Sequence, residues 1–300
     1  MTALGVAVMS CTIDKTDFEA ELNTEIIEYV EFSEAVSINS DDYQISIEAL
    51  NGTFYKGYNE IRLQLRNIQS NQDIENSEIS FLPIITTYNG EVASCPHSYN
   101  LEYNDIEDYY SGYVVFTENS SDTESWMLYI SFTVEGQIFT VTRDIIVEEQ
   151  TNKNLNMTSF TGNDGEQYYI ALVAPQSPEI GENELVAGIY KYQQPEGEAG
   201  DFPDPSQFTF YEAENYTLLL DPRMPEPSMG NHSSPNNQDL IQYEDGLYYG
   251  VVNYTMTGNW TLNFIMLNAD GETIKGTEVP TDFTPGVEGV KSELHIDILF

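Results

Sequence analysis

The chain has 300 residues and a formal net charge of -40, with 50 Asp and Glu residues against 10 Lys and Arg residues. This charge excludes nucleic acid as a partner, because phosphate contacts require Lys and Arg, and it disfavours direct contact with an anionic membrane surface. Apolar residues make up 40% of the chain, including 21 Tyr and 14 Phe, which excludes a disordered acidic chain and suits two folded domains.

The N-terminal apolar run ends in Cys11. Residues 3–9 are too few to span a bilayer, which needs ~20 apolar residues. Residues 8–11, VMSC, resemble a bacterial lipobox, which implies cleavage before Cys11 and lipidation of its thiol. No Lys or Arg precedes the run, as it would in a signal peptide. We expect residues 1–11 to be a truncated lipoprotein signal that anchors the chain to the bacterial outer membrane, facing the periplasm or the cell surface. The alternative is a free tail with an incidental cysteine.

The rest of the chain reads as short strands separated by turn residues, with little helical periodicity. It predicts an all-β protein of two tandem immunoglobulin-like antiparallel β-sandwich domains. The first sandwich is expected over 41–150 and the second over 166–300, where the last six residues add a C-terminal strand. Residues 12–40 are predicted to be an acidic tether, and 151–165 the linker between the domains.

The two domains are expected to be repeats of one another. An alternating strand and a turn lead in each half to the motif G-x-N-E, at residues 57–60 and 181–184, where a second strand begins. Trp126 and Trp260 each open a later alternating run and are expected to lie in a core. The second repeat is longer by about ten residues, which we place in the Pro-, Gly- and acid-rich segment 192–206.

The loop over residues 221–233 gathers soft metal ligands. Met224, Met229 and His232 lie there among prolines and glycines, in a stretch that is not expected to be an interior strand. Thioether sulfur and imidazole nitrogen suit copper, Cu(I) better than Cu(II). Met256 lies in a later turn and joins this set if that turn is at the same end of the sandwich. The alternative is a surface turn with two exposed methionines and a locally hydrogen-bonded histidine.

Cys95 and His97 form a second candidate pair. Residues 95–98, CPHS, are aligned with residues 230–233, GNHS, so that His97 is placed on His232. Side chains two residues apart share a face of an extended segment, and the thiolate and imidazole are expected as further copper ligands, in a site shared with the second repeat. The alternative is a buried cysteine beside a hydrogen-bonded histidine.

With these landmarks, the second repeat resembles the YtkA-like family over about 160–275. The residues that carry the resemblance are Gly181-x-Asn183, Met224-Pro225, Met229-Gly230-x-His232, Gly246-x-Tyr248 and Met256-x-Gly258-x-Trp260. The resemblance implies an immunoglobulin-like sandwich that occurs beside copper-handling and respiratory-oxidase proteins. The first repeat looks like a diverged copy, with Asn89 and Ser94 aligned with the two loop methionines.

Catalysis is not expected. The three histidines have no G-x-S-x-G motif near them, and the chain has neither a P-loop nor a Rossmann glycine fingerprint; a pair of catalytic carboxylates among so many acids is left open. The sequence therefore predicts an envelope lipoprotein that binds copper and passes it to or from a membrane protein, a transporter or a copper enzyme. The alternative is a non-metal scaffold or accessory subunit of an outer-membrane or surface complex, which uses its tandem domains for protein–protein interaction.

Overall fold

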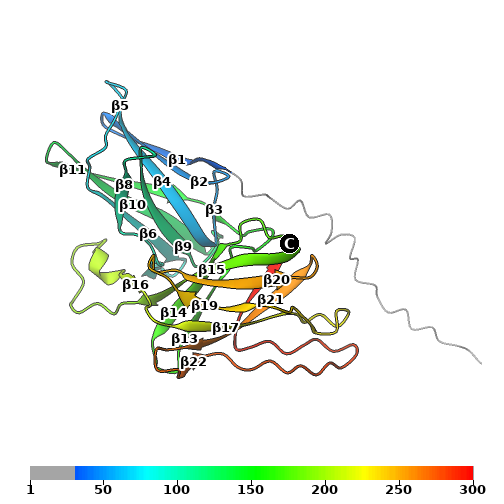
Figure 1. Cartoon of the computed structure of the whole chain (residues 1–300). Coiled ribbons are helices and arrows are strands. Elements are labelled where there is room, and N and C mark those ends of the chain that lie inside the picture. The colour runs from blue at the N-terminus through cyan, green and yellow to red at the C-terminus, as the bar shows by residue number, and fades with distance from the viewer. Residues whose placement is uncertain (1–30, 300) are drawn as a thin grey trace, which may run out of the picture.

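The computed structural model describes residues 31–299, which fold into β-strands and one short 3-10 helix. The strands form two antiparallel β-sandwich domains, seen one above the other in Figure 1. The predicted all-β class with two tandem sandwiches is thereby confirmed. The predicted signal and lipobox over residues 1–11, with Cys11, lie outside the described residues. No helix among residues 31–299 has the length and apolarity that crossing a bilayer demands.

The first domain folds one path of paired strands into the two layers of a sandwich. β8 turns the corner, because its residues 100–101 pair with one layer and residues 102–104 with the other. Every second residue of β2 and β4 is buried, as the alternation predicts. The path runs through β1 (Phe32–Ser40), β2 (Tyr43–Leu50), β4 (Gly57–Asn67), β9 (Tyr109–Phe116), β8 (Asn100–Asn104), β6 (Ile79–Thr87), β10 (Glu124–Val134) and β11 (Gln137–Ile145). Four short strands complete the domain: β3 (Phe54–Tyr55), β5 (Gln72–Asp73), β7 (Val92–Ala93) and β12 (Val147–Glu148).

The second domain repeats this order strand for strand. Its path runs through β13 (Met157–Thr161), β14 (Gln167–Ala174), β15 (Gly181–Tyr192), β20 (Tyr248–Tyr254), β19 (Gln238–Gln242), β17 (Thr217–Met224), β21 (Asn259–Leu267) and β22 (Thr273–Lys275). The remaining strands are β16 (Phe210–Glu212), β18 (His232–Ser233) and β23 (Leu294–Leu299), which pair with β15, β17 and β21. The repeat seen in the sequence is therefore a repeat of topology.

The G-x-N motif has the same structural role in both domains. Asn59 accepts a hydrogen bond from the Tyr55 N–H and donates to the carbonyls of Tyr55 and Gly57. Asn183 makes the same three bonds, to Glu179 and to the glycine two residues before it. Gly57 has a φ of 103°, a region that favours glycine. The motif thus fixes the corner from which β4 and β15 start.

The two tryptophans close the same end of each sandwich. Trp126 and Trp260 are each 1% exposed, which confirms that both are core residues. The indole Nε1 of Trp126 donates to the Glu118 carbonyl at 2.8 Å, and that of Trp260 to the Met256 carbonyl at 3.0 Å. In both domains the tryptophan therefore ties the turn before its own strand to the core.

Two of the predicted boundaries are wrong. The tether over 12–40 was extended too far, because residues 32–40 form β1 and pair with β2. The linker over 151–165 includes residues 157–161, which form β13 and pair with β14. Both strands end their paths, so each has one neighbour on the path and several exposed polar residues. These polar residues weaken the apolar alternation, which in β1 is limited to Val36 and Ile38.

The connection between the domains is short and buried. The side chain of Gln150 is 4% exposed; its Nε2 donates to the carbonyls of Lys56 and Leu155, and its Oε1 accepts from the Leu155 N–H. Both ends of the connection are thus hydrogen-bonded to one side chain. The connection holds the domains together, instead of acting as a flexible linker.

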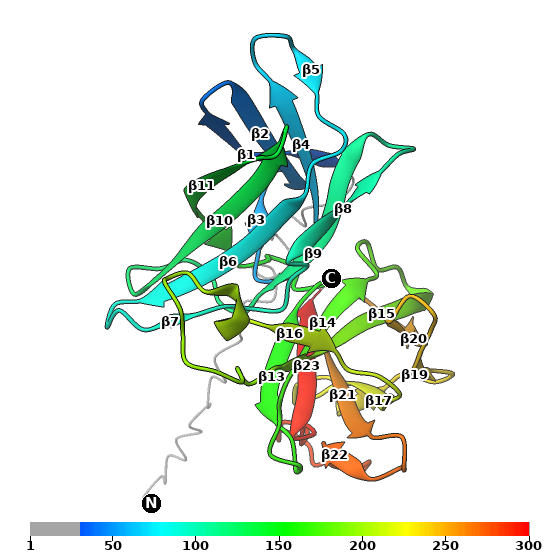
Figure 2. The same cartoon turned by 90° about the vertical axis from the view of Figure 1, so that its left-hand side faces the viewer.

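The domains also pack directly against each other. Val115 of the first domain is buried with Met157, Ala171 and Tyr190 of the second, and the ring centroids of Tyr113 and Tyr190 are 5.2 Å apart. The insertion predicted over 192–206 is a loop with the 3-10 helix η1 (Pro205–Gln207), and it reaches back over the first domain (Figure 2). Phe208, just after η1, is buried with Leu82 and Ile84 of β6. The insertion therefore connects the two domains. We call residues 193–210, from the end of β15 to the first residue of β16, the clasp.

Candidate metal centre

Met224 and His232 face each other at one end of the second sandwich. Met224 is the last residue of β17 and His232 the first of β18, and they are direct partners in this antiparallel pair. Directly opposite residues lie on the same face of a sheet with their Cβ atoms about 5 Å apart. Met229 lies in the loop between them, where its carbonyl accepts a hydrogen bond from the His232 N–H at 3.2 Å.

Met256 reaches the same end from the turn between β20 and β21. Met229 and Met256 are both partly buried against the core cluster that contains Met224 and Trp260. A Cβ added to Gly258 would lie 2.8 Å from Met224 Cε, so this turn covers the end of the Met224 side chain. The thioethers of Met224, Met229 and Met256 thus all pack on the core of the second domain, and the Met256 carbonyl accepts a hydrogen bond from the Trp260 indole.

The imidazole of His232 completes this group, which we call the methionine end: Met224, Met229, His232 and Met256. His232 Nε2 is 2.8 Å from Thr255 Oγ1, and its ring centroid is 6.0 Å from that of Trp260. The threonine orients the ring, and the tryptophan supports it from the core side. Both contacts come from the β20–β21 turn and the strand that follows it.

Met224 is more buried than its sequence context predicts. Its exposed fraction is 3%, although Pro222 lies in the same strand and prolines are confined to positions where no ladder bond is needed. On the side away from β21, β17 pairs with β19 at Thr217 and Leu218 and with β18 at Arg223 and Met224. Pro222 falls between these pairings, so its missing N–H costs no ladder bond, and the strand continues into the core.

The pairing register corrects the counterpart of Met224 in the first domain. Pro83 on β6 faces Leu128, two residues after Trp126, and Pro222 on β17 faces Leu262, two residues after Trp260. Counting along the strand from the prolines places Ile85 where Met224 lies. The alignment with Asn89 is therefore wrong.

His97 is not the counterpart of His232. In the first domain Ile85 pairs with Ala93 of β7, as Met224 pairs with His232 of β18. Ala93 is thus the residue equivalent to His232, whereas His97 bridges to Val114 on β9. The two pairs have the same spacing, eight residues from Ile85 to Ala93 and from Met224 to His232, so an alignment on the shared histidine is shifted by four residues.

Cys95 and His97 point into different environments. Cys95 is fully buried in the first core, and burial raises the pKa of its thiol, which disfavours the thiolate that a metal requires. His97 Nδ1 is 2.7 Å from the Cys95 carbonyl oxygen, and its ring contacts Tyr99 and Phe210. Among the contacts of residues 31–299, none joins this pair to the methionine end. Residues 94–99 are not a regular strand, so the alternation of an extended segment does not place these two side chains.

Two oxygens of the loop after Met224 are buried without a hydrogen-bond partner in the described part of the chain: Glu226 Oε2 and Asn231 Oδ1. Unpaired buried acceptors are uncommon and cost ~1–3 kcal/mol each. Residues 31–299 hold no group of three or more His, Cys, Asp or Glu side chains that could bind a metal. Metal binding at the methionine end would therefore depend on thioethers and one imidazole, a donor set that suits Cu(I).

Comparisons with known proteins do not assign the chain to a family. No family model matches it, and no curated protein matches it either. Among solved structures, a conserved domain protein from Bacillus anthracis aligns with a TM-score of 0.32 and 11% identity, covering 91% of this chain and 92% of its own. A DUF4785 family protein from Legionella pneumophila aligns with a TM-score of 0.24 and 8% identity, covering 77% of this chain and 55% of its own.

Proposed function

We propose that the chain binds copper, as Cu(I), at the methionine end of its second sandwich and passes it to or receives it from a partner. The observation that supports this most directly is the strand pair of Met224 and His232 beside Trp260, with Met229 in the loop between them and Met256 in the turn that covers Met224. Three thioethers and one imidazole form a soft donor set that hard cations do not prefer.

The burial of these side chains fits transfer better than permanent storage. Met224 is in the core and is held by its strand, whereas Met229 and Met256 are only partly buried, on a loop and a turn. A partner's ligand could replace the two outer thioethers one at a time while Met224 and His232 keep the ion. Copper would move by ligand exchange, without redox turnover by this chain.

The proposed place of action follows from the sequence. A lipid on Cys11 would anchor the chain to the outer membrane of a bacterial envelope, and the partner would be a membrane protein, a transporter or a copper enzyme. With a net charge of -40, the chain would meet a partner through a basic surface. Under this proposal the protein is a carrier and not an enzyme, and the YtkA-like resemblance describes its domains.

Titration of Cu(I) into the full-length Cys11→Ser protein, without oxygen and against a competing chelator, tests the proposal. One equivalent is expected to bind with a Kd well below micromolar. Met229→Leu/His232→Gln keeps both side-chain volumes and is expected to weaken binding at least about 100-fold, the loss of roughly 3 kcal/mol of ligand contacts. Met127→Leu, a change in the first domain, is the matched control.

Two results would contradict the proposal: no binding tighter than micromolar, or binding that is unchanged in Met229→Leu/His232→Gln. Either result would leave the scaffold or accessory-subunit alternative. Thermal unfolding of each variant shows whether a loss of binding comes from a loss of fold. Because Met229 and His232 are only partly buried, we expect little change in unfolding temperature.

A further inference from the structure

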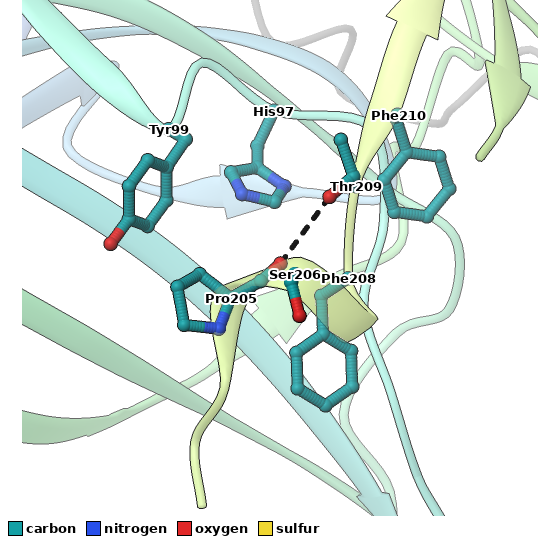
Figure 3. Close-up of a pocket in the computed structure, with 7 residues that line it drawn as sticks. All are labelled: His97, Tyr99, Pro205, Ser206, Phe208, Thr209 and Phe210. Carbon is teal, nitrogen blue, oxygen red and sulfur yellow. Dashed lines mark hydrogen bonds between the residues drawn. The ribbon is translucent and has the colours of Figure 1, made fainter. Parts of the chain in front are cut away.

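A cavity of about 220 Å³ lies between the two domains, away from the methionine end. Its walls are His97 and Tyr99 of the first domain and residues 205–210 of the clasp, except Gln207. In Figure 3 the imidazole of His97 lies between Tyr99 and Thr209, above the turn that starts at Pro205. Cavities at domain interfaces are common binding sites.

The walls of this cavity are fixed by the surrounding structure. Phe208 is 8% exposed and packs on β6. Phe210 has its ring centroid 5.5 Å from that of Tyr169 and 5.4 Å from that of Tyr192. Asp204 caps η1 by accepting a hydrogen bond from the Ser206 N–H. A ligand would therefore meet a preformed site and lose little affinity to ordering it.

His97 presents a hydrogen-bond acceptor to the cavity. Its Nδ1 lies 2.7 Å from the Cys95 carbonyl, and a carbonyl only accepts, so Nδ1 carries the proton. Burial lowers the pKa of His97 to about 4, so the ring is neutral at pH 7 and Nε2 holds a lone pair. His97 is 8% exposed, and no hydrogen bond to Nε2 is made within residues 31–299. This nitrogen is thus a buried acceptor that a ligand can reach.

The lining selects against ions and sugars. No Asp, Glu, Lys or Arg lines the cavity, although the chain has 50 acidic residues, so neither a cation nor an anion would find a countercharge. A sugar would bring more hydroxyls than the site can pair, because Thr209 Oγ1 already donates to the Pro205 carbonyl and unpaired buried polar groups are costly. The rings of His97, Tyr99 and Phe210 meet at steep angles of 65–69°, which suits edge-to-face contact with an inserted ring.

We propose that this cavity binds a small uncharged aromatic ring that carries one O–H or N–H donor, such as a phenol or an indole. The ring packs against Phe208 and Phe210, and its donor is bonded to His97 Nε2. The same group occurs in free small molecules and in the tyrosine and tryptophan side chains of peptides. The site joins both domains, so its occupation stabilises their arrangement. It does not depend on copper binding.

The proposal is tested on the full-length Cys11→Ser protein by NMR of the imidazole C–H signals, which are few because the chain has three histidines. Phenol and indole are expected to shift the His97 signals with Kd values of roughly 0.1–1 mM, a range suited to ligands of this size. Benzene, which has no donor, is expected to bind at least tenfold more weakly, and benzoate, which is charged, not at all. The blocked peptide Ac-Gly-Tyr-Gly-NH2 separates the two sources: tighter binding than phenol indicates a peptide ligand, and weaker binding a free molecule.

Variants locate the site. Ser206→Trp places a large side chain at the exposed rim and is expected to abolish binding, whereas Ser177→Trp, an exposed serine elsewhere in the second domain, is the matched control. His97→Phe keeps a ring but removes the acceptor and its signals, so binding to this variant is followed by the NMR line broadening of the ligand; phenol should then bind no better than benzene. The proposal is overturned if phenol and indole cause no shift up to about ten times the expected Kd range, or if Ser206→Trp leaves binding intact. Equal affinities for phenol and benzene in the unsubstituted protein would overturn the assigned role of His97.

Discussion

The two sandwiches have the same strand order, and they differ most at the end that each tryptophan closes. Ile85 and Ala93 form the strand pair there in the first domain, and Met224 and His232 form it in the second. The surrounding frame is unchanged, since both indoles donate to a turn carbonyl. The difference teaches that Met224 and His232, the proposed ligands, are not needed for the fold, because the first domain forms the same strand pair without them.

The clasp is a second difference between the domains. The corresponding connection in the first domain leads from β4 through β5 to β6 and contains no insertion of this kind, whereas the second domain extends residues 193–209 over its partner. As a result, the cavity and much of the interface depend on a segment that only one repeat has. The following predictions test which features belong to the shared frame and which to one domain.

The largest effect is expected when the methionine end is given the residues of the first domain. Met224→Ile/His232→Ala copies Ile85 and Ala93 and should weaken Cu(I) binding by more than about 100-fold, since a soft thioether and the imidazole are both lost. The chelator competition assay measures this. Because the frame accepts these residues in the first domain, the unfolding temperature should change little. A large drop in unfolding temperature would show that the two ends are not equivalent.

A smaller effect is expected when the asparagine of each G-x-N motif is replaced, and the loss of stability should differ between the two domains. Asn59 is 6% exposed and Asn183 is half-buried, although their three hydrogen bonds are the same. Asn59→Ala leaves buried polar groups unpaired and should cost ~2 kcal/mol of unfolding free energy, whereas water can replace part of the bonds in Asn183→Ala, at a cost of ~1 kcal/mol. Denaturant unfolding measures both, with exposed Asn100→Ala as the control. Equal costs would show that burial does not set the contribution of the motif.

Much of the frame could be predicted from the sequence, because central strands and tryptophans carry strong local signals. The alternation in β2 and β4, the glycines at 57 and 181 and both tryptophans were located correctly. The edge strands β1 and β13 were missed, because a strand with one neighbour keeps polar residues on its open face.

The site was harder to predict. Met224 and His232 are direct strand partners, and Met229 and Met256 pack on the same core. The match of His97 to His232 failed, because an alignment of two short motifs does not reveal differences in loop length. The cavity depends on a contact between distant segments, which no local pattern encodes. Its one signal in the sequence is the presence of Phe202, Phe208 and Phe210 in a segment otherwise rich in Pro, Gly and acid.

Removal of one tyrosine hydroxyl is expected to change the free energy of unfolding in opposite directions at the domain interface and in the second core. Tyr190 is 1% exposed, and its hydroxyl is buried with no hydrogen-bond partner in residues 31–299, so Tyr190→Phe should stabilise the protein by ~1 kcal/mol. The Tyr248 hydroxyl donates to the Ala213 carbonyl at 2.6 Å and accepts from the Tyr216 N–H at 3.3 Å. Tyr248→Phe should therefore destabilise by ~1 kcal/mol. Changes of the same sign in denaturant unfolding would contradict this difference.

A small gain in copper affinity, instead of a loss, is expected when two of the proposed ligands are moved to the first domain. Ile85→Met/Ala93→His, built in the Met224→Ile/His232→Ala background, places one thioether and one imidazole as direct strand partners in the first domain. Met229 and Met256 are not copied, so only two of the four ligands are transferred, and the affinity for Cu(I) should rise by about tenfold above that background. The competition assay used for the other variants measures this gain.

Each outcome of this exchange has a separate meaning. A gain of about tenfold agrees with a site in which Met229 and Met256 supply the rest of the affinity. Full recovery of binding would show that those two methionines are not ligands, because Met224 and His232 would then account for the whole site. No gain, with an unchanged unfolding temperature, would contradict the register that makes Ile85 and Ala93 the equivalents of Met224 and His232. The experiment thus tests the comparison of the two domains at the strand pair that carries Met224 and His232 in the second domain.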